Sequence, residues 1–148
     1  QMVNVLQAVL LTDGAKMIKT PTYHVFDLFQ HHQNGTLVDT CLETEQVGTA
    51  DWQVPQISQS VSKDENGTLH LTLANASNTE AATLEVHLFG TTARTVTGRM
   101  LHGEMHQRNT FDAPEPVTLE ALPAIAMGEG GFTVTLPPCT VAHVQVQA

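Results

Sequence analysis

The pattern of hydrophobic and polar positions changes near residue 35 and divides the chain into two parts. The first part opens with an apolar run, "NVLQAVLLT" (residues 4–12), which leads into the turn residues "DGAK". A run of this kind is typical of a buried strand or of a buried helix, and periodicity does not separate the two. Because a helix is predicted directly after the turn, we expect the first 35 residues to form a strand, a turn and a helix, the unit of an α/β fold.

The helix is predicted over "TPTYHVFDLFQHHQNG" (residues 20–35), where apolar side chains recur at helical spacing. Thr20 is the expected N-cap, Pro21 suits the first helical position, and Gly35 is the stop signal. The expected apolar face consists of Thr22, Val25, Phe26 and Phe29.

After Gly35 the pattern alternates with a period of two, which is typical of strands, and turn residues separate the segments. This part shows almost no helix signal, so an antiparallel two-sheet β-sandwich, jelly-roll-like, is predicted over residues 36–148. The seven predicted strands are "ISQSVSK" (57–63), "TLHLTLAN" (68–75), "TLEVHLFG" (83–90), "RTVTGRML" (94–101), "PVTLEAL" (116–122), "GFTVTLPP" (131–138) and "TVAHVQVQ" (140–147).

The same alternation assigns side chains to the two faces of each strand. Leu69, Leu71 and Leu73 are expected to face the core. The alternate positions carry His70, His87 and His143, which are expected to be exposed on outer faces.

The charge of the chain narrows the classes of partner. The net charge is −9 with only six Lys and Arg, so binding to nucleic acid or to an anionic membrane surface is not expected. No run of about 18 apolar residues is present, and no basic region precedes an apolar stretch as in a secretory signal. The sequence starts at Gln1 in the middle of an apolar segment, which favours a piece of a longer chain.

Two cysteines, Cys41 and Cys139, lie far apart in the sequence. Two buried free thiols in a reducing cytosol are the favoured interpretation, and one disulfide is the alternative. A cytoplasmic location is therefore expected.

His102 and His106 are spaced i, i+4 and are the best local candidates for a metal site. Their segment, "HGEMH", departs from the H-E-x-x-H arrangement, because Glu104 is at the wrong offset and Gly103 disfavours a helix. We expect histidines of a long loop here and no metal site. His31 and His32, at the predicted C-terminus of the helix, are expected to interact with the helix dipole.

The remaining residues offer no recognisable catalytic constellation or cofactor motif. No acidic pair stands out as a glycosidase would require, and there is no G-x-S-x-G or phosphate-binding glycine loop. Exposed aromatic rings could make a carbohydrate-binding module, which is the alternative function. Aromatic residues are few, however, and Trp52 is expected to pack against the sandwich.

Several segments together resemble the C-terminal region of glycoside hydrolase family 51, the α-L-arabinofuranosidases. "VNVLQAVLLTDGAKMIKTPTYHVFDLFQHH" resembles the last strand and helix of that family's catalytic (β/α)₈ barrel. "HQRNTFDAPEPV" resembles the family's "HNTFD-x-P-x-x-V" stretch, and "FTVTLPPCTVAHVQV" resembles its closing strand pair, with Cys139 at a position usually held by a small hydroxyl residue. The order and spacing are consistent over nearly the whole chain.

The resemblance implies that residues 1–35 are a remnant of the barrel and that residues 36–148 are an accessory sandwich domain. It implies a parent enzyme that is exo-acting and retaining, needs no cofactor, and releases terminal arabinofuranosyl groups from arabinan or arabinoxylan oligosaccharides. Both catalytic glutamates would lie upstream of Gln1, so this chain is expected to be inactive by itself.

The resemblance also implies partners. Gln1, or alternatively Gln7, would be the residue that contacts arabinose in the parent. An N-terminal strand of the full chain would join the sandwich, and without it an open sheet edge is expected. Without that strand, the chain is expected to self-associate through the open edge or through the apolar face of residues 4–29.

Phe111 is expected to be buried and to anchor the loop that contains "NTFDAP".

Overall fold

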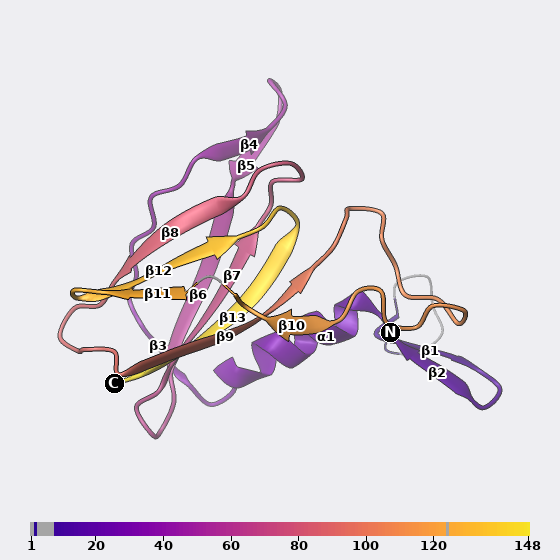
Figure 1. Ribbon diagram of the computed structural model, residues 1–148, viewed down its shortest axis with the longest axis horizontal. Coiled ribbons are helices and arrows are strands. Elements are labelled where there is room, and N and C mark those ends of the chain that lie inside the picture. The colour runs from indigo at the N-terminus through magenta and orange to yellow at the C-terminus, as the bar shows by residue number, and fades with distance from the viewer. Residues whose placement is uncertain (1, 3–7, 124) are drawn as a thin grey trace.

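The computed structural model describes residue 2, residues 8–123 and residues 125–148. Two antiparallel sheets face each other, and one helix covers the outer side of the larger sheet (Figure 1). Over the described residues, the helical elements are α1 (Pro21–Phe29) and the 3₁₀ turn η1 (Gln30–His32). The strands are β1 (Leu10–Asp13), β2 (Lys16–Lys19), β3 (Thr36–Leu37), β4 (Gln46–Gly48), β5 (Gln53–Pro55), β6 (Ile57–Lys63), β7 (Leu69–Asn75), β8 (Ala82–His87), β9 (Thr95–His102), β10 (Leu119–Ala121), β11 (Ile125–Gly128), β12 (Gly131–Leu136) and β13 (Thr140–Gln147).

The larger sheet has the strand order β10-β9-β13-β7-β6-β3, and the smaller has the order β11-β12-β8. Their facing sides share one core, to which β12 contributes Phe132, Val134 and Leu136 from above the larger sheet. The opposing side chains include Leu71, Leu73, Val144 and Val146. The predicted two-sheet sandwich is therefore confirmed, and each of the seven predicted segments contains a strand.

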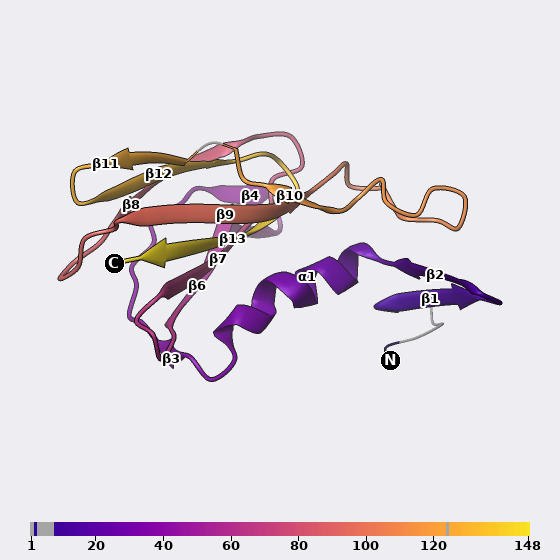
Figure 2. The ribbon, with the colours of Figure 1, turned by 60° about the horizontal axis from the view of Figure 1, so that its bottom comes forward.

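Helix α1 forms a third layer beneath the larger sheet, on the side away from β11, β12 and β8 (Figure 2). Pro21 occupies the first helical position, as predicted. Leu28 is 0% exposed and packs with Leu101 and Val117 in a second, smaller core. Residues on both sides of position 35 therefore share buried contacts.

The buried face of α1 differs from the expected one. His24 and Leu28 are the buried residues of the helix, whereas Phe26 is 64% exposed and Phe29 is 43% exposed. Both spacings satisfy helical periodicity, so the sequence pattern alone did not identify the face that packs against the sheet. The aromatic face remains open at the surface.

The segment before α1 contains a hairpin across the predicted turn, and its second strand, β2, was not predicted. Residues 4–7 of the expected strand lie outside the described residues. β1 pairs with β2 across a turn in which Gly14 adopts a positive φ of 56°. Thr20 stands at the N-cap, but its hydroxyl donates to the carbonyl oxygens of Ala8 (2.8 Å) and Val9 (3.0 Å) instead of capping the helix. It thereby ties the start of α1 to the chain before β1.

The hairpin of β4 and β5 projects beyond the sandwich at the top of Figure 1. Trp52 lies in its turn and is 76% exposed, so the prediction that Trp52 packs against the sandwich was wrong.

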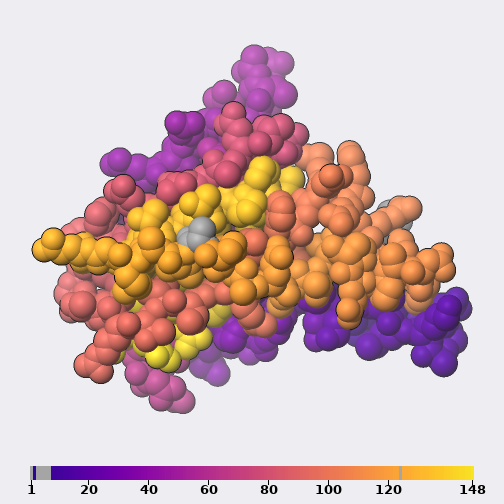
Figure 3. Space-filling view, viewed as in Figure 1, coloured from indigo at the N-terminus to yellow at the C-terminus, as the bar shows by residue number. Residues whose placement is uncertain are grey.

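Residues 103–118 form the predicted long loop, which lies beside the β1–β2 hairpin at the right of Figure 3. Asn109, 6% exposed, joins the two: its side-chain amide donates to the carbonyl oxygen of Lys19. Phe111 is half-buried, so the expectation of a buried anchor was wrong, and the buried anchors of the loop are Asn109 and Val117.

Among the described residues, no helix is both long enough and apolar enough to cross a membrane.

Candidate functional site

A cluster of histidines lies between the helical layer and the larger sheet. His31 comes from η1, His70 from β7 and His143 from β13, so segments far apart in the sequence supply the three rings. The ring of His31 is stacked on that of His143 with centroids 4.3 Å apart and planes 10° apart. His70 and His143 lie nearly in one plane, with centroids 5.3 Å apart and an angle of 15°.

The hydrogen bonds of this cluster define its protonation pattern. Asp64 accepts from Nε2 of His70 at 3.3 Å, so that nitrogen carries a proton. Nδ1 of His70 then has a lone pair that faces Nε2 of His143 at 3.1 Å. When His143 is neutral, its Nε2–H is the donor, and the chain runs from His143 through His70 to Asp64.

The neighbouring His32 is held separately. Its Nδ1 lies 2.7 Å from the hydroxyl of Ser62, and its Nε2 lies 2.9 Å from the hydroxyl of Thr72. Hydroxyl groups both donate and accept, so these two contacts suit either tautomer of the ring. η1 is thus attached to β6 and β7 through a single side chain.

Burial lowers the pKa of three of these rings, those of His143, His31 and His32. Burial and the nearby His31, His70, His32 and Arg99 lower the pKa of His143 to about 3. Burial, followed by the charges of His70 and Arg99, lowers the pKa of His31. Burial, followed by His70 and His31, lowers the pKa of His32 in the same way.

On the acidic side of the cluster, desolvation raises the pKa of Asp64, but hydrogen bonds outweigh it. The backbone N–H groups of Thr68 and Asn66 and the ring of His70 donate to the carboxylate, so the pKa of Asp64 lies below its ordinary value. Asp64 is therefore a carboxylate throughout the range in which histidines titrate.

The nitrogen atoms of His31, His70 and His143 lie within 4.8 Å of one another, which raises the question of a metal ion. A zinc–nitrogen bond is about 2.0–2.1 Å and lies close to the plane of the imidazole ring. Facing nitrogens 3.1 Å apart in nearly coplanar rings suit a hydrogen bond and leave no space for an ion between them. A ring stacked at 4.3 Å directs its lone pairs parallel to those of its neighbour, so the observed arrangement does not fit metal coordination.

Two sequence expectations about these histidines were wrong. His70 is 6% exposed and His143 is 4% exposed, although both occupy alternate positions of their strands. Helix α1 and η1 cover the outer face of the sheet, so both faces of β7 and β13 are buried. His87, on β8, is exposed as expected.

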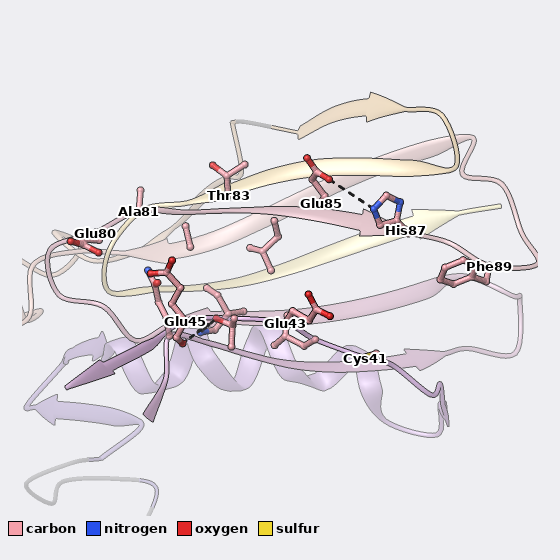
Figure 4. A pocket seen from close by; sticks show the side chains of 15 residues that line it. Cys41, Glu43, Glu45, Glu80, Ala81, Thr83, Glu85, His87 and Phe89 are labelled. Atoms are coloured by element: carbon pink, nitrogen blue, oxygen red, sulfur yellow. Dashed lines mark hydrogen bonds and ion pairs between the residues drawn. The ribbon is translucent and has the colours of Figure 1, made fainter. Parts of the chain in front are cut away.

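A groove lies between β8 and the segment of residues 41–45 (Figure 4). Its volume is about 770 Å³, and it adjoins an apolar hollow of about 490 Å³. Leu71, Leu73 and Val86 line the hollow, so the interior of the sandwich is open to the surface along β8.

The rim of the groove is acidic and carries one exposed aromatic ring. Glu43, Glu45 and Glu85 line it, and Phe89 at one end is 93% exposed. Glu85 and His87 are 3.9 Å apart, and both are well exposed, so this pair contributes little to stability. The hollow is apolar and lies beside β8, whose outer edge has no partner strand among the described residues of its sheet. A further polypeptide strand could pair with this edge and cover the hollow.

The remaining candidates from the sequence are dispersed. Nδ1 of His102 bonds with the carbonyl oxygen of Pro138 at 3.0 Å, while His106 is exposed in the long loop. Gln1 and Gln7 lie outside the described residues.

The cysteine expectation was confirmed in part. Cys41 and Cys139 are both free thiols, as expected, but Cys41 is exposed and Cys139 is half-buried. The expectation that both are buried was wrong.

The fold and these sites define a β-sandwich domain with its own helical layer and an open groove along one sheet edge. The family model of the α-L-arabinofuranosidase C-terminal domain matches residues 1–140. The chain therefore belongs to the family of α-L-arabinofuranosidase C-terminal domains, and it is the C-terminal region of a glycoside hydrolase family 51 protein.

Individual relatives agree with this assignment. An intracellular exo-α-L-arabinofuranosidase of Bacteroides ovatus is 31% identical over 149 residues, covering 99% of this chain and 29% of that protein. The structure of a family 51 arabinofuranosidase from Xanthomonas axonopodis pv. citri superposes with a TM-score of 0.95 at 36% identity, covering 99% of this chain and 30% of the other. For a family 51 α-L-arabinofuranosidase from Bifidobacterium longum the TM-score is 0.87 at 27% identity, with the same coverage. The chain thus spans about 30% of the length of these relatives.

Proposed function

We propose that this chain is the non-catalytic C-terminal domain of an exo-acting, retaining α-L-arabinofuranosidase that releases terminal arabinofuranosyl groups from arabinan and arabinoxylan oligosaccharides. The observation that carries the proposal is the match over 99% of this chain to about 30% of family 51 enzymes. A retaining glycosidase uses two carboxyl groups about 5–5.5 Å apart, one as acid/base and one as nucleophile. In this proposal a barrel encoded upstream supplies both groups, and this chain alone is inactive.

The proposed partner of α1 is that barrel. Phe26, at 64% exposure, and Phe29, at 43%, are exposed side chains of the helix, and Met17 of β2 is 57% exposed. Exposed apolar side chains of this size mark a surface that another protein layer covers. Residues 1–35 would then be the last strand and helix of the barrel, and residues 36–148 the sandwich domain.

The groove beside β8 is the proposed site of an N-terminal strand of the full-length enzyme. In the smaller sheet β8 pairs with β12 and is the last strand in the order. An added strand would pair with its free edge and cover the apolar hollow beneath it. In the absence of that strand, we expect this chain to self-associate through the same edge or through the open face of α1. Light scattering at high concentration tests this, and a monomer would contradict it.

For the sugar itself, we propose that Gln1, or alternatively Gln7, contacts arabinose in the complete enzyme. Neither contact requires a cofactor or a metal. The expected location of the enzyme is the cytoplasm, and the intracellular relative from Bacteroides ovatus supports this.

A carbohydrate-binding module is the second candidate, because Phe89 and Trp52 are exposed at 93% and 76%. Rings in this position can stack on a sugar. Calorimetry with arabino-oligosaccharides decides between the candidates: millimolar or tighter binding that is lost in Phe89→Ala or Trp52→Ala would support the module. Absence of heat at these concentrations would support the structural role.

The structural role can be tested by replacing acidic residues of this chain in the longer enzyme and measuring its activity. Glu43→Gln and Glu85→Gln should each leave kcat for an aryl α-L-arabinofuranoside within about twofold, since neither carboxylate is proposed to react. A loss on the order of a thousandfold, as follows removal of a catalytic group, would contradict the proposal.

A further inference from the structure

The histidine cluster joins the helical layer to the larger sheet next to a small apolar contact. Leu28, in the last turn of α1, is the buried apolar residue of the helix and packs on Leu101 and Val117. Directly after it in the chain, η1 touches β6, β7 and β13 through His31 and His32. Attachment of η1 therefore depends on imidazole rings, and attachment of α1 depends on these rings together with Leu28.

We propose that this cluster is a pH-sensitive latch: neutral His31, stacked on His143 and His70, holds α1 and η1 on the larger sheet, and proton uptake by the cluster in mild acid releases them. Every contact named in the latch lies within this chain.

The stack is built for neutral rings. His31 lies 4.3 Å from His143 and 5.5 Å from His70, centroid to centroid, and all three planes are within 15° of parallel. Two imidazolium rings at such distances repel each other across a site from which water is largely excluded. The low pKa values of His31 and His143 express the same cost.

The charged groups around the cluster cannot balance the positive charge that several added protons would bring. On the side of β7, Asp64 accepts from His70 and can balance one positive charge. From α1, Asp27 faces His31, but it is paired with Arg99 of β9 at 3.4 Å. Arg99 itself adds a positive charge near both His31 and His143.

His32 and His24 are two further rings of the helical layer whose pKa values are lowered by burial. His32 is bonded to the hydroxyls of Ser62 and Thr72, which carry no charge that could balance a proton. At the other end of the layer, burial lowers the pKa of His24; Lys19 lowers it further, while Asp27 and Glu115 act in the opposite direction. Each of these rings is thus protonated more readily when the layer is detached from the sheet.

Release would have a local consequence. Phe26 and Phe29 are exposed side chains of α1, so detachment of the layer moves these two rings relative to the sandwich. The sandwich core between β7, β12 and β13 contains no ionisable side chain among its clustered residues and has no reason to respond in the same pH range.

Hydrogen–deuterium exchange of the purified protein between pH 7.5 and pH 5, corrected for the intrinsic pH dependence of exchange, tests the latch. The amides of residues 21–32 should lose at least tenfold in protection, whereas those of 131–136 in β12 should stay within threefold. In His31→Phe, which keeps a flat ring but cannot take up a proton, the loss over 21–32 should shrink to less than threefold. His87→Phe, at an exposed position of β8, is the matched control and should behave as the wild type.

Three results would overturn the latch: constant protection of 21–32 in the wild type, an unchanged loss in His31→Phe, or an equal loss in 131–136, which would indicate global unfolding. If His31→Phe is unprotected already at pH 7.5, His31→Leu replaces it. NMR of the histidine Hε1 protons in the wild type provides a second readout. His31 and His143 should titrate only as protection of 21–32 is lost, and titration with full protection would also overturn the latch.

Discussion

The side-chain amide of Asn109 donates a hydrogen bond to the backbone carbonyl oxygen of Lys19, at 2.8 Å and across 90 positions of sequence. The same amide donates to the carbonyl oxygen of Val117 at 2.8 Å, and its oxygen accepts from the Val117 N–H at 2.9 Å. One buried side chain therefore closes the long loop on itself and fixes the loop to β2. The "NTFD" segment, which carries the family resemblance, has a structural role at its first residue.

Asn109→Ala should destabilise the protein by about 2–3 kcal/mol, because it leaves the buried N–H of Val117 without a partner. Asn66→Ala is the matched control: Asn66 is exposed in a turn, and we expect a change within about 0.5 kcal/mol. Urea denaturation followed by circular dichroism measures both. Equal stability of the two variants would contradict the role assigned to Asn109.

The two faces of α1 should respond differently to truncation. Leu28→Ala should cost about 2–5 kcal/mol, since it opens a cavity in a fully buried site. Phe26→Ala removes a larger side chain from a position that is 64% exposed and should cost less than about 1 kcal/mol in this chain. Thermal unfolding of both variants gives the comparison. The opposite ranking would mean that the helix presents its aromatic face to the sheet.

The stability of the protein should fall as the pH decreases from 7 to 5. The pKa of His143 is about 3 in the folded protein, whereas an unfolded histidine has a pKa of about 6.5. The unfolded chain therefore binds the proton first, and the stability contributed by neutral His143 is complete above pH 6.5 and is lost towards pH 3. This residue alone should account for about 2 kcal/mol between pH 7 and pH 5.

His143→Gln removes that titration and keeps an N–H that can donate to His70. Its free energy of unfolding should therefore depend less steeply on pH than that of the wild type, while His106→Gln, in the exposed loop, should leave the slope unchanged. Chemical denaturation at a series of pH values measures the slopes. Parallel slopes for all three proteins would show that His143 does not control the acid response.

Trp52→Ala should change the free energy of unfolding by less than about 0.5 kcal/mol, because the indole lies in a projecting turn and is 76% exposed. Intrinsic fluorescence of the wild type should accordingly show the emission of a solvent-exposed tryptophan. Blue-shifted emission that moves to longer wavelength on unfolding would instead indicate a packed indole.

The strands of the sandwich were predictable because each one buries one face in a shared core. In "TLHLTLAN" the alternation correctly identified Leu69, Leu71 and Leu73 as the residues that face the core. The prediction that the opposite face is exposed was wrong, because a helical segment covers His70 and His143. That segment lies more than 35 residues before His70 in the chain. Alternation describes a strand's own two sides and carries no information on what covers them.

The candidate site was not predictable for a related reason. His31, His70 and His143 lie far apart in the sequence, and no spacing connects them. A row of polar residues across β7 and β13 would have indicated that something covers their outer face. In this row, His143 lies opposite Thr72, and Gln145 lies opposite His70. The register that brings these residues together is known only from the structure. The helix face was ambiguous because His24 and Leu28 recur at the same spacing as Val25 and Phe29.

We propose that this chain supports a catalytic domain and performs no glycoside hydrolysis itself. Hydrolysis of an aryl α-L-arabinofuranoside tests this, measured side by side for residues 1–148 and for the product of the reading frame extended upstream through a barrel. We expect no turnover above the uncatalysed rate for residues 1–148 and turnover by the extended protein. Turnover by residues 1–148 alone, abolished by replacing an acidic residue of this chain, would contradict it.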